Sequence, residues 1–246
     1  MSGINDYCMK IALIGYGKMG REIGKIAIDR SHTVNLILDI HNRHELTVEN
    51  LKSCDVAIEF TIPGTAVDNY LACFRAGIPV VSGTTGWLDR RDEVTEACKK
   101  SDGTFFYASN FSVGVNLFFR LNTFLAKLMA PQSGYSVDLT EIHHTQKLDS
   151  PSGTAITLAE QLIKNLPGKS KWTNDTEATD SEVLIQSERI GTTPGTHTIR
   201  FDSAADYIEI THCAKNRQGF ATGAVLAAEF CLTRKGILTM DDMLKF

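Results

Sequence analysis

The stretch KIALIGYGKMG at residues 10–20 decides the fold class of this chain. It opens with Lys10–Ile14, an apolar run of strand length, and continues with glycines in a G-x-G-x-x-G pattern. Helical spacing of apolar residues then runs from Met19 to Ile28. A glycine turn between a strand and a helix can accept a pyrophosphate, because the helix N-terminus leaves unpaired N–H groups there. The turn therefore predicts a dinucleotide site that comprises Gly15, Tyr16, Gly17, Lys18, Met19 and Gly20.

Beyond this turn, short β-rich runs alternate with helical segments up to about Ala108. Strands are expected at Thr33–Asp39, Asp55–Phe60, Ile78–Val81 and Thr104–Ala108, and helices at Val67–Ala76 and Leu88–Lys100. Strands separated by helices of this length pair in parallel through right-handed crossovers. The sequence therefore predicts an α/β chain whose N-terminal domain, residues 1–111, is a Rossmann-type parallel sheet. Between the second and third strands, Ile40–Cys54 is polar and irregular.

Polar residues at the carboxyl ends of these strands are candidates for holding the cofactor, because ligands of such sheets bind at that edge. Asp39 lies about 20 residues after the glycine turn, where a carboxylate accepts hydrogen bonds from the adenosine ribose and repels a 2′-phosphate. NADH is therefore favoured over NADPH, although Arg43 could bind that phosphate from the irregular segment. Asn110 is a candidate for the carboxamide and Phe111 for an apolar wall. The remaining candidates are Thr61, Gly83, Thr84, Thr85 and Ser109.

The pattern changes after Ala108, and residues 112–217 are expected to form a second α+β domain. Helices are predicted at Val115–Met129 and Ala155–Leu166, strands at Tyr135–His143, Glu182–Ile190, His197–Phe201 and Tyr207–Cys213, and a polar loop at Lys169–Asp180. This mixed sheet has an open face, and another subunit is the simplest cover for it. A final apolar helix at Ala221–Leu232 is expected to return to the first domain, so that residues 218–246 complete it.

The densest cluster of chemically active residues is EIHHTQKLDSPSGTA at residues 141–155. A helix begins after Ser152, and its first turn offers unpaired N–H groups to an anion. With Lys147 and two histidines nearby, this is an anion site with proton donors attached. A carboxylate fits it better than a metal, because adjacent histidines with no further ligand at the usual spacing do not form a zinc site. His143 and His144 face opposite sides of a strand, so we expect them to have different roles.

With these residues in view, the chain resembles the 4-hydroxy-tetrahydrodipicolinate reductase (dihydrodipicolinate reductase) family of lysine and diaminopimelate biosynthesis. The resemblance covers nearly the whole chain from Met9. It implies an NAD(P)H-dependent reduction of a small cyclic dicarboxylate imine, a two-domain subunit, and a homotetramer joined through the sheets of the middle domain. The motifs that carry it are His143–Ala155, Gly83–Gly86, Asn110–Asn116, Gly195–His197, Ile210–His212, Asn216–Arg217 and Phe220–Ala221.

The resemblance also implies roles for individual residues. The acid/base histidine of the family corresponds to His143, and its proton-donating lysine to Lys147. Its contacts to the substrate carboxylates correspond to His144, Lys147, Gly153 and Thr154. The chain departs from the family pattern where Thr145-Gln146 replaces a basic pair, which would lower carboxylate affinity. Its glycine turn is also one residue shorter than the common family form.

Two other functions stay open at this point. One is a different two-domain NAD-dependent dehydrogenase that acts on an amino acid such as aspartate, and the other is a non-catalytic NAD(P)H sensor. The dehydrogenase would share the first domain but has no reason to carry His143 and Lys147 together with the helix start at Ser152–Thr154. The sensor would keep the glycine turn and lose the proton donors.

Composition excludes several classes of protein. A net charge of −4 over 246 residues provides no basic surplus for binding nucleic acid. No apolar run approaches the roughly 20 residues of a membrane span, and Met1–Cys8 does not resemble a signal peptide, so a cytoplasmic location is expected. The six cysteines form no C-x-x-C pair and are expected to be reduced and mostly buried. Cys98, beside two lysines, is the candidate for a reactive thiol.

Overall fold

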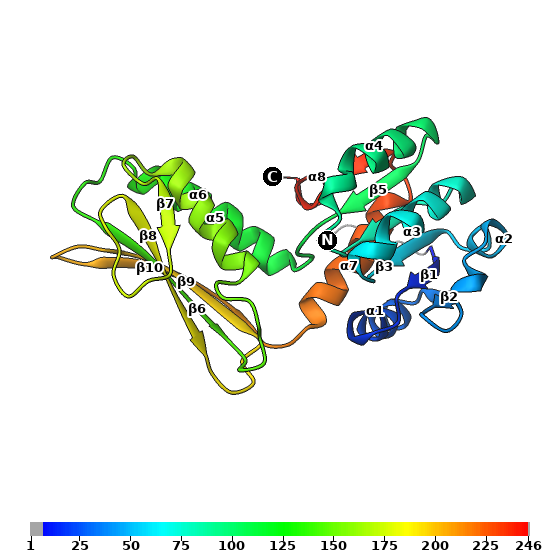
Figure 1. Cartoon of the computed structure of the whole chain (residues 1–246), viewed down its shortest axis with the longest axis horizontal. Helices are drawn as coiled ribbons and strands as arrows, with labels where there is room; N and C mark the ends of the chain where they lie inside the picture. The colour runs from blue at the N-terminus through cyan, green and yellow to red at the C-terminus, as the bar shows by residue number, and fades with distance from the viewer. Residues whose placement is uncertain (1–6, 246) are drawn as a thin grey trace. The chain divides into compact units, whose positions relative to one another are not determined.

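The computed structural model describes residues 7–245, so most of the Met1–Cys8 stretch lies outside it. The chain divides into two compact units (Figure 1). The first unit runs up to Val113 and resumes at Gln218, and the second unit is Gly114–Arg217. The domain boundaries expected from the sequence differ from this division by two residues at one junction. Among residues 7–245, no helix is long and apolar enough to cross a membrane.

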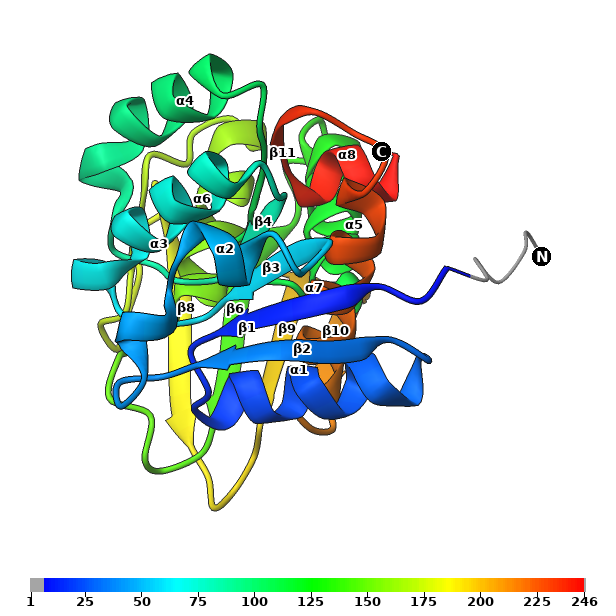
Figure 2. The ribbon, with the colours of Figure 1, turned by 90° about the vertical axis from the view of Figure 1, so that its right-hand side faces the viewer.

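The first unit is built on a six-stranded parallel sheet, which confirms the predicted fold class. Its strands are β1 Lys10–Ile14, β2 Thr33–Leu38, β3 Val56–Glu59, β4 Val80–Ser82, β5 Thr104–Tyr107 and β11 Gly236–Leu238. They lie in the order β11-β5-β4-β3-β1-β2, and Figure 2 shows β2, β1 and β3 following one another from the lower edge. The strand β11 has only three residues and was not predicted. The central strands are apolar on both sides, because helices cover both faces of the sheet.

Each face of this sheet has its own hydrophobic core. Successive side chains of β1 point to opposite faces and so belong to different cores. Ala12 and Ile14 face the core under α2 Val48–Leu51, α3 Pro63–Ala76 and α4 Arg91–Lys100. Ile11 and Leu13 face the core under α1 Lys18–Asp29, α7 Gln218–Cys231 and α8 Met240–Leu244. The short turns η1 Arg43–Glu45 and η2 Leu88–Arg90 complete the unit. The final apolar helix was predicted to return to the first domain, and α7 does belong to the first unit. Helix α8 was not predicted.

The second unit has a five-stranded mixed sheet with two helices on one face. Its strands are β6 Ser136–His143, β7 Lys171–Thr173, β8 Glu182–Arg189, β9 Gly195–Asp202 and β10 Tyr207–Ala214, in the order β10-β9-β6-β8-β7. The helices α5 Val113–Met129 and α6 Gly153–Asn165 bury Leu139 and Ile185 from the sheet. Residues that alternate with these are half-buried or exposed on the other face. Strand β7 lies where a polar loop was expected, so that prediction was wrong over three residues.

The cysteines are all unpaired, and four of the six are buried. Cys98 is fully buried in the core under α4, and burial raises the pKa of its thiol. Removal from water disfavours the thiolate, so the structure argues against Cys98 as a reactive thiol. Cys8 and Cys213 are exposed.

Candidate active site

The glycine turn between β1 and α1 has the shape that its sequence predicted. Gly15 has φ +97°, and a Cβ there would lie 2.0 Å from the carbonyl oxygen of Phe60. A Cβ on Gly20 would lie 2.0 Å from the carbonyl oxygen of Gly15, so this glycine lets the helix pack against the turn. A Cβ on Gly17 would meet nothing within 4 Å, and no side chain caps the helix at this residue. The backbone at Gly17 is therefore open to an approaching ligand.

A cavity of about 450 Å³ lies in front of this turn. It brings together the glycine turn and the loops that follow β3 and β4, three segments that are far apart in the sequence. Eight of its ten lining residues are predicted cofactor-binding residues, namely Gly17, Lys18, Met19, Gly20, Thr61, Gly83, Thr84 and Thr85. The other two are Phe60 and Pro63. The carboxyl edge of the parallel sheet thus forms a pocket with unpaired backbone groups, hydroxyls and one lysine.

Other predicted cofactor residues lie outside this lining. Asp39 follows β2 and is exposed, and its carboxylate accepts a hydrogen bond from the His41 backbone N–H at 2.7 Å. Arg43 is also exposed, in η1. Phe111 is only 2% exposed, and its ring stacks on Phe106 in the core under α7. Its side chain is therefore a core residue, and the structure does not place it as an apolar wall of the cavity. Ser109 is exposed and Asn110 half-buried.

A buried carboxylate supports two of the loops that line the cavity. Glu59, at the end of β3, is fully buried and accepts hydrogen bonds from Ser82 Oγ at 2.7 Å, from Asn69 Nδ2 at 3.3 Å and from the Thr61 hydroxyl. The Thr61 backbone N–H donates in turn to Thr84 Oγ1 at 2.8 Å. These bonds fix the loops after β3 and β4 relative to one another. Sequence reasoning did not assign Glu59 a role, and a charged residue closing an apolar strand was the available signal.

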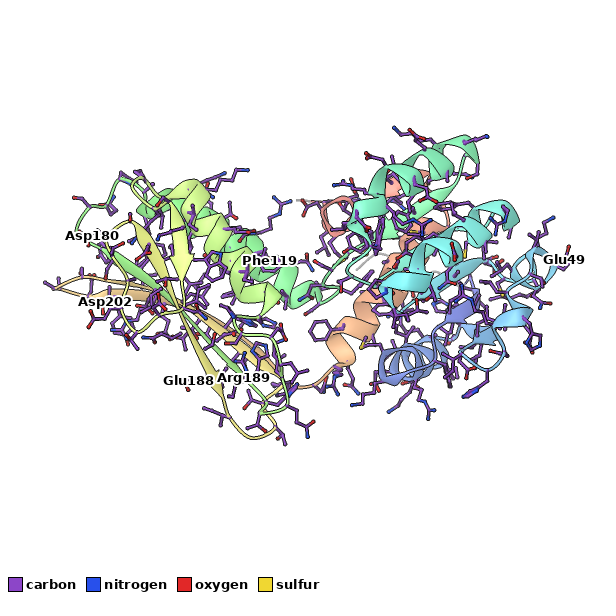
Figure 3. The ribbon with its side chains drawn as sticks, in the orientation of Figure 1. Glu49, Phe119, Asp180, Glu188, Arg189 and Asp202 are labelled. Carbon is purple, nitrogen blue, oxygen red and sulfur yellow. The ribbon has the colours of Figure 1, made fainter. Side chains whose placement is uncertain are left out.

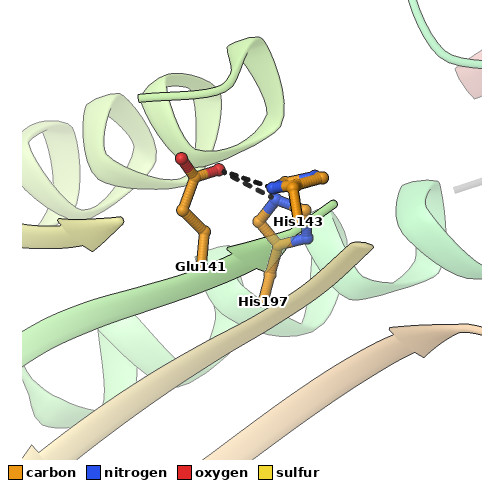
Figure 4. A group of neighbouring side chains, drawn as sticks. All are labelled: Glu141, His143 and His197. Atoms are coloured by element: carbon orange, nitrogen blue, oxygen red, sulfur yellow. Dashed lines mark ion pairs between the residues drawn. The ribbon is translucent and has the colours of Figure 1, made fainter. Parts of the chain in front are cut away.

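The second unit gathers a different set of side chains at one end of its sheet. The strand register places Ser187 of β8, Glu141 of β6 and His197 of β9 in one row. His143 is two residues further along β6, next to Arg189 of β8. Since side chains on a strand alternate, Glu141 and His143 point to the same face of the sheet. Figure 4 shows both imidazoles turned toward one oxygen of the Glu141 carboxylate.

The Glu141 carboxylate is the centre of this cluster and is fully buried. Its Oε2 lies 3.3 Å from His143 Nδ1 and 3.7 Å from His197 Nε2. Its Oε1 accepts from Ser187 Oγ at 2.8 Å and lies 3.4 Å from the Arg189 guanidinium. Burial alone would raise the pKa of Glu141, but the imidazoles and the hydrogen bonds outweigh burial and hold that pKa well below its usual range. Burial lowers the pKa of His197.

The predicted anion site lies next to this cluster. Ser152 is the N-cap of α6, with its hydroxyl accepting from the Ala155 N–H at 3.2 Å, and its own N–H donates to Glu141 Oε1 at 3.0 Å. Gly153, which follows, is exposed and Thr154 is half-buried. Lys147 is half-buried and pairs with a neighbouring carboxylate, Asp149, at 2.8 Å. His144 is half-buried and is not part of the Glu141 cluster, as expected from its position beside His143.

Glu141, His143 and His197 have the residue types of a metal site, and their ligand atoms lie within 4.8 Å of one another. Sequence reasoning did not find this group, because His197 is brought in from β9 by strand pairing. Arg189 contacts the same carboxylate, and a guanidinium beside a site repels a cation. The contacts are those of an ion-pair network built around one carboxylate.

Comparison with known proteins agrees with both units. Residues 9–111 match the family model described as dihydrodipicolinate reductase, N-terminus, and residues 114–244 match the C-terminus model. The 4-hydroxy-tetrahydrodipicolinate reductase of Christiangramia forsetii is 52% identical, over 96% of this chain and 98% of that protein. The enzyme of the same name from Methanosarcina acetivorans is 35% identical, over 95% of this chain and 88% of that protein.

A solved structure shares the fold. Dipicolinate-bound dihydrodipicolinate reductase from Paenisporosarcina sp. TG-14 superposes with a TM-score of 0.78 at 23% identity, covering 96% of this chain and 99% of that one. The family models together span almost all of the described residues, and the C-terminus model covers the second unit and the segment from Gln218 that returns to the first. The chain therefore belongs to the 4-hydroxy-tetrahydrodipicolinate reductase family of nicotinamide-dependent oxidoreductases.

Proposed function

We propose that this chain reduces 4-hydroxy-tetrahydrodipicolinate to tetrahydrodipicolinate in lysine and diaminopimelate biosynthesis, with His143 and Lys147 as proton donors. The observation that supports the proposal is that His143 contacts Glu141, the carboxylate that also accepts the N–H of Ser152 at the N-cap of α6. Lys147 pairs with Asp149 in the segment that leads into this helix. A cyclic dicarboxylate imine needs an anion site for its carboxylates and an acid for its nitrogen. The second unit supplies both. The relative whose structure was solved with dipicolinate supports the same substrate class.

The substrate would be bound by its carboxylates. Gly153 and Thr154 begin α6, where backbone N–H groups and a hydroxyl can donate hydrogen bonds to an anion. Lys147 and His144 add donors beside this turn. Lys147 pairs with Asp149 in this structure, so binding a substrate carboxylate exchanges one partner of the ammonium for another. This exchange keeps the ammonium at the site, ready to donate a proton as charge develops on the substrate nitrogen.

The cavity of the first unit would hold the cofactor. Its open Gly17 backbone fits a pyrophosphate, and the Thr61, Thr84 and Thr85 side chains offer hydroxyls. When bound, a nicotinamide cofactor supplies the hydride. Asp39 is exposed after β2, where it would bond the ribose hydroxyls of NADH and repel the extra phosphate of NADPH. We therefore expect a preference for NADH.

The open face of the second sheet is consistent with a homotetramer. On this face, Tyr207 of β10 is 57% exposed, whereas Ile208 next to it points to the helix-covered face, where its pairing partner Phe201 is buried. A second copy of the chain would cover Tyr207. Light scattering on the purified protein tests this, and a monomer would contradict it. The cytoplasmic location expected from the sequence stays a prediction.

The experiment that tests the function follows NADH oxidation by absorbance, with substrate generated in situ by the preceding synthase. His143→Ala and Lys147→Ala should each lower kcat by ~10² to 10⁴-fold, the usual cost of removing a positioned acid, while NADH still binds. Thr154→Val should weaken inhibition by 2,6-pyridinedicarboxylate. Near-normal turnover in both alanine variants would refute the assigned roles. A wild-type protein that oxidises aspartate, and leaves this substrate unchanged, would be an amino-acid dehydrogenase instead.

A further inference from the structure

We propose that Glu141 is a positioning residue that orients the His143 ring and anchors the N-terminus of α6, so that one buried carboxylate aligns the proton donor and the carboxylate-binding turn. The proposal rests on the proposed function, because it takes His143 as the donor. Glu141 itself is fully buried and cannot be a substrate contact. Its partners divide between its two oxygens, and each oxygen serves one half of the proposed site.

The first half is the His143 ring. Glu141 Oε2 lies 3.3 Å from His143 Nδ1, and both atoms are buried with no other hydrogen-bond partner among the described residues. A carboxylate at this position favours a proton on Nδ1 and leaves Nε2 as the nitrogen available to a substrate. A Cβ on Gly195 would lie 3.0 Å from His143 Nε2, so glycine at this position leaves room for the ring in this orientation.

The second half is the first turn of α6. Glu141 Oε1 accepts the Ser152 N–H at 3.0 Å, and Ser152 Oγ contacts His197 Nε2 at 3.2 Å. Ser152 immediately precedes Gly153 and Thr154, the residues proposed to receive a carboxylate. The backbone of the turn is therefore tied to the same side chain that contacts His143. Loosening this tie would displace the anion site without touching the donor.

Charged and titratable groups face Glu141 from every neighbouring element. Arg189 of β8 contacts Oε1, and its guanidinium also donates to the Asp149 carbonyl oxygen at 2.6 Å, which ties the loop after Lys147 to the sheet. Arg189 lies beside the exposed Glu188 near the end of β8 (Figure 3). His197 of β9 completes the set. Buried ion networks are often no more stabilising than apolar packing, so alignment of the site accounts for this one better than stability alone.

Two substitutions separate the two halves. Glu141→Gln removes the charge beside His143 but keeps an oxygen that can accept the Ser152 N–H, whereas Glu141→Ala removes both. In Glu141→Gln we expect kcat to fall about 10²-fold, with the affinity for 2,6-pyridinedicarboxylate changed less than threefold. Glu141→Ala should lose at least tenfold in analogue affinity as well.

The controls keep this proposal distinct from the proposed function. Glu160→Gln makes the same change at an exposed position of α6 and should leave kcat, KM and the affinity for 2,6-pyridinedicarboxylate unchanged. The double variant Glu141→Gln with His143→Ala should be no slower than His143→Ala alone, because Glu141 acts through that ring. Thermal melting and NADH binding verify folding of each variant. A Glu141→Gln enzyme with wild-type kcat would overturn the positioning role. Near-normal turnover in His143→Ala would overturn the donor role of His143, and a wild-type protein that does not oxidise NADH with this substrate would overturn the function.

Discussion

The substitution Gly20→Ala tests whether close packing at the glycine turn determines stability. The added Cβ would lie 2.0 Å from the Gly15 carbonyl oxygen and 3.0 Å from its carbon. Neither atom can withdraw easily, because the Gly15 N–H donates to the Leu38 carbonyl at 2.8 Å and Gly15 is itself pressed against Phe60. Alanine gains about 1 kcal/mol of helix propensity over glycine, and overpacking of this kind costs roughly 3 kcal/mol or more.

The net loss is therefore about 2 kcal/mol, which corresponds to a decrease in Tm of roughly 4 to 8 °C for a chain of this size. Differential scanning calorimetry measures the Tm, and titration with NADH followed by fluorescence measures the affinity of the glycine turn for the cofactor. Gly17→Ala is the matched control, because its Cβ meets nothing within 4 Å. It should cost less than about 1 kcal/mol of stability yet weaken NADH binding at least about tenfold, since the methyl group occupies the approach of the pyrophosphate. Unchanged stability in Gly20→Ala, or normal NADH affinity in Gly17→Ala, would refute this reasoning.

Three further predictions concern the cofactor, acid stability and the thiols. NADH should exceed NADPH in kcat/KM by roughly five- to thirtyfold, about 1 to 2 kcal/mol, and Asp39→Ala should erase the difference; an NADPH preference that disappears in Arg43→Ala would contradict this. The pKa of Glu141 is lower in the folded state than in the unfolded chain, so its carboxylate stabilises the fold at pH values above the unfolded-state pKa. This contribution is lost as the pH falls toward the folded-state pKa. The Tm of the wild type should therefore fall more between about pH 5 and pH 3 than that of Glu141→Gln, and parallel curves would argue against the network. In the native protein, a thiol reagent should modify no cysteines other than Cys8 and Cys213, the two that are exposed. Rapid modification of a third thiol would contradict the burial of the other four.

Local patterns in the sequence predicted the elements that depend on contiguous residues. The glycine turn, the strand before it and the helix after it are one segment, and the residue types at Gly15 and Gly20 are required by backbone geometry. The same holds for the N-cap at Ser152, whose side chain bonds within its own helix. Strands β7 and β11 have three residues each, too few for a periodic signal, and they exist because a neighbouring strand offers unpaired backbone groups.

Contiguous residues predict the fold class, the glycine turn and the segment that carries His143 and Lys147. The partners of those residues depend on packing between distant segments. Glu141 meets Ser187 and His197 because strand register places them in one row, and register depends on pairing between segments that are distant in the chain. The ring of Phe111 lies in the core for a similar reason, since apolar burial there outweighs any local preference for the strand end. Contacts within a segment follow from its residues, whereas contacts between segments depend on the free energy of the whole fold.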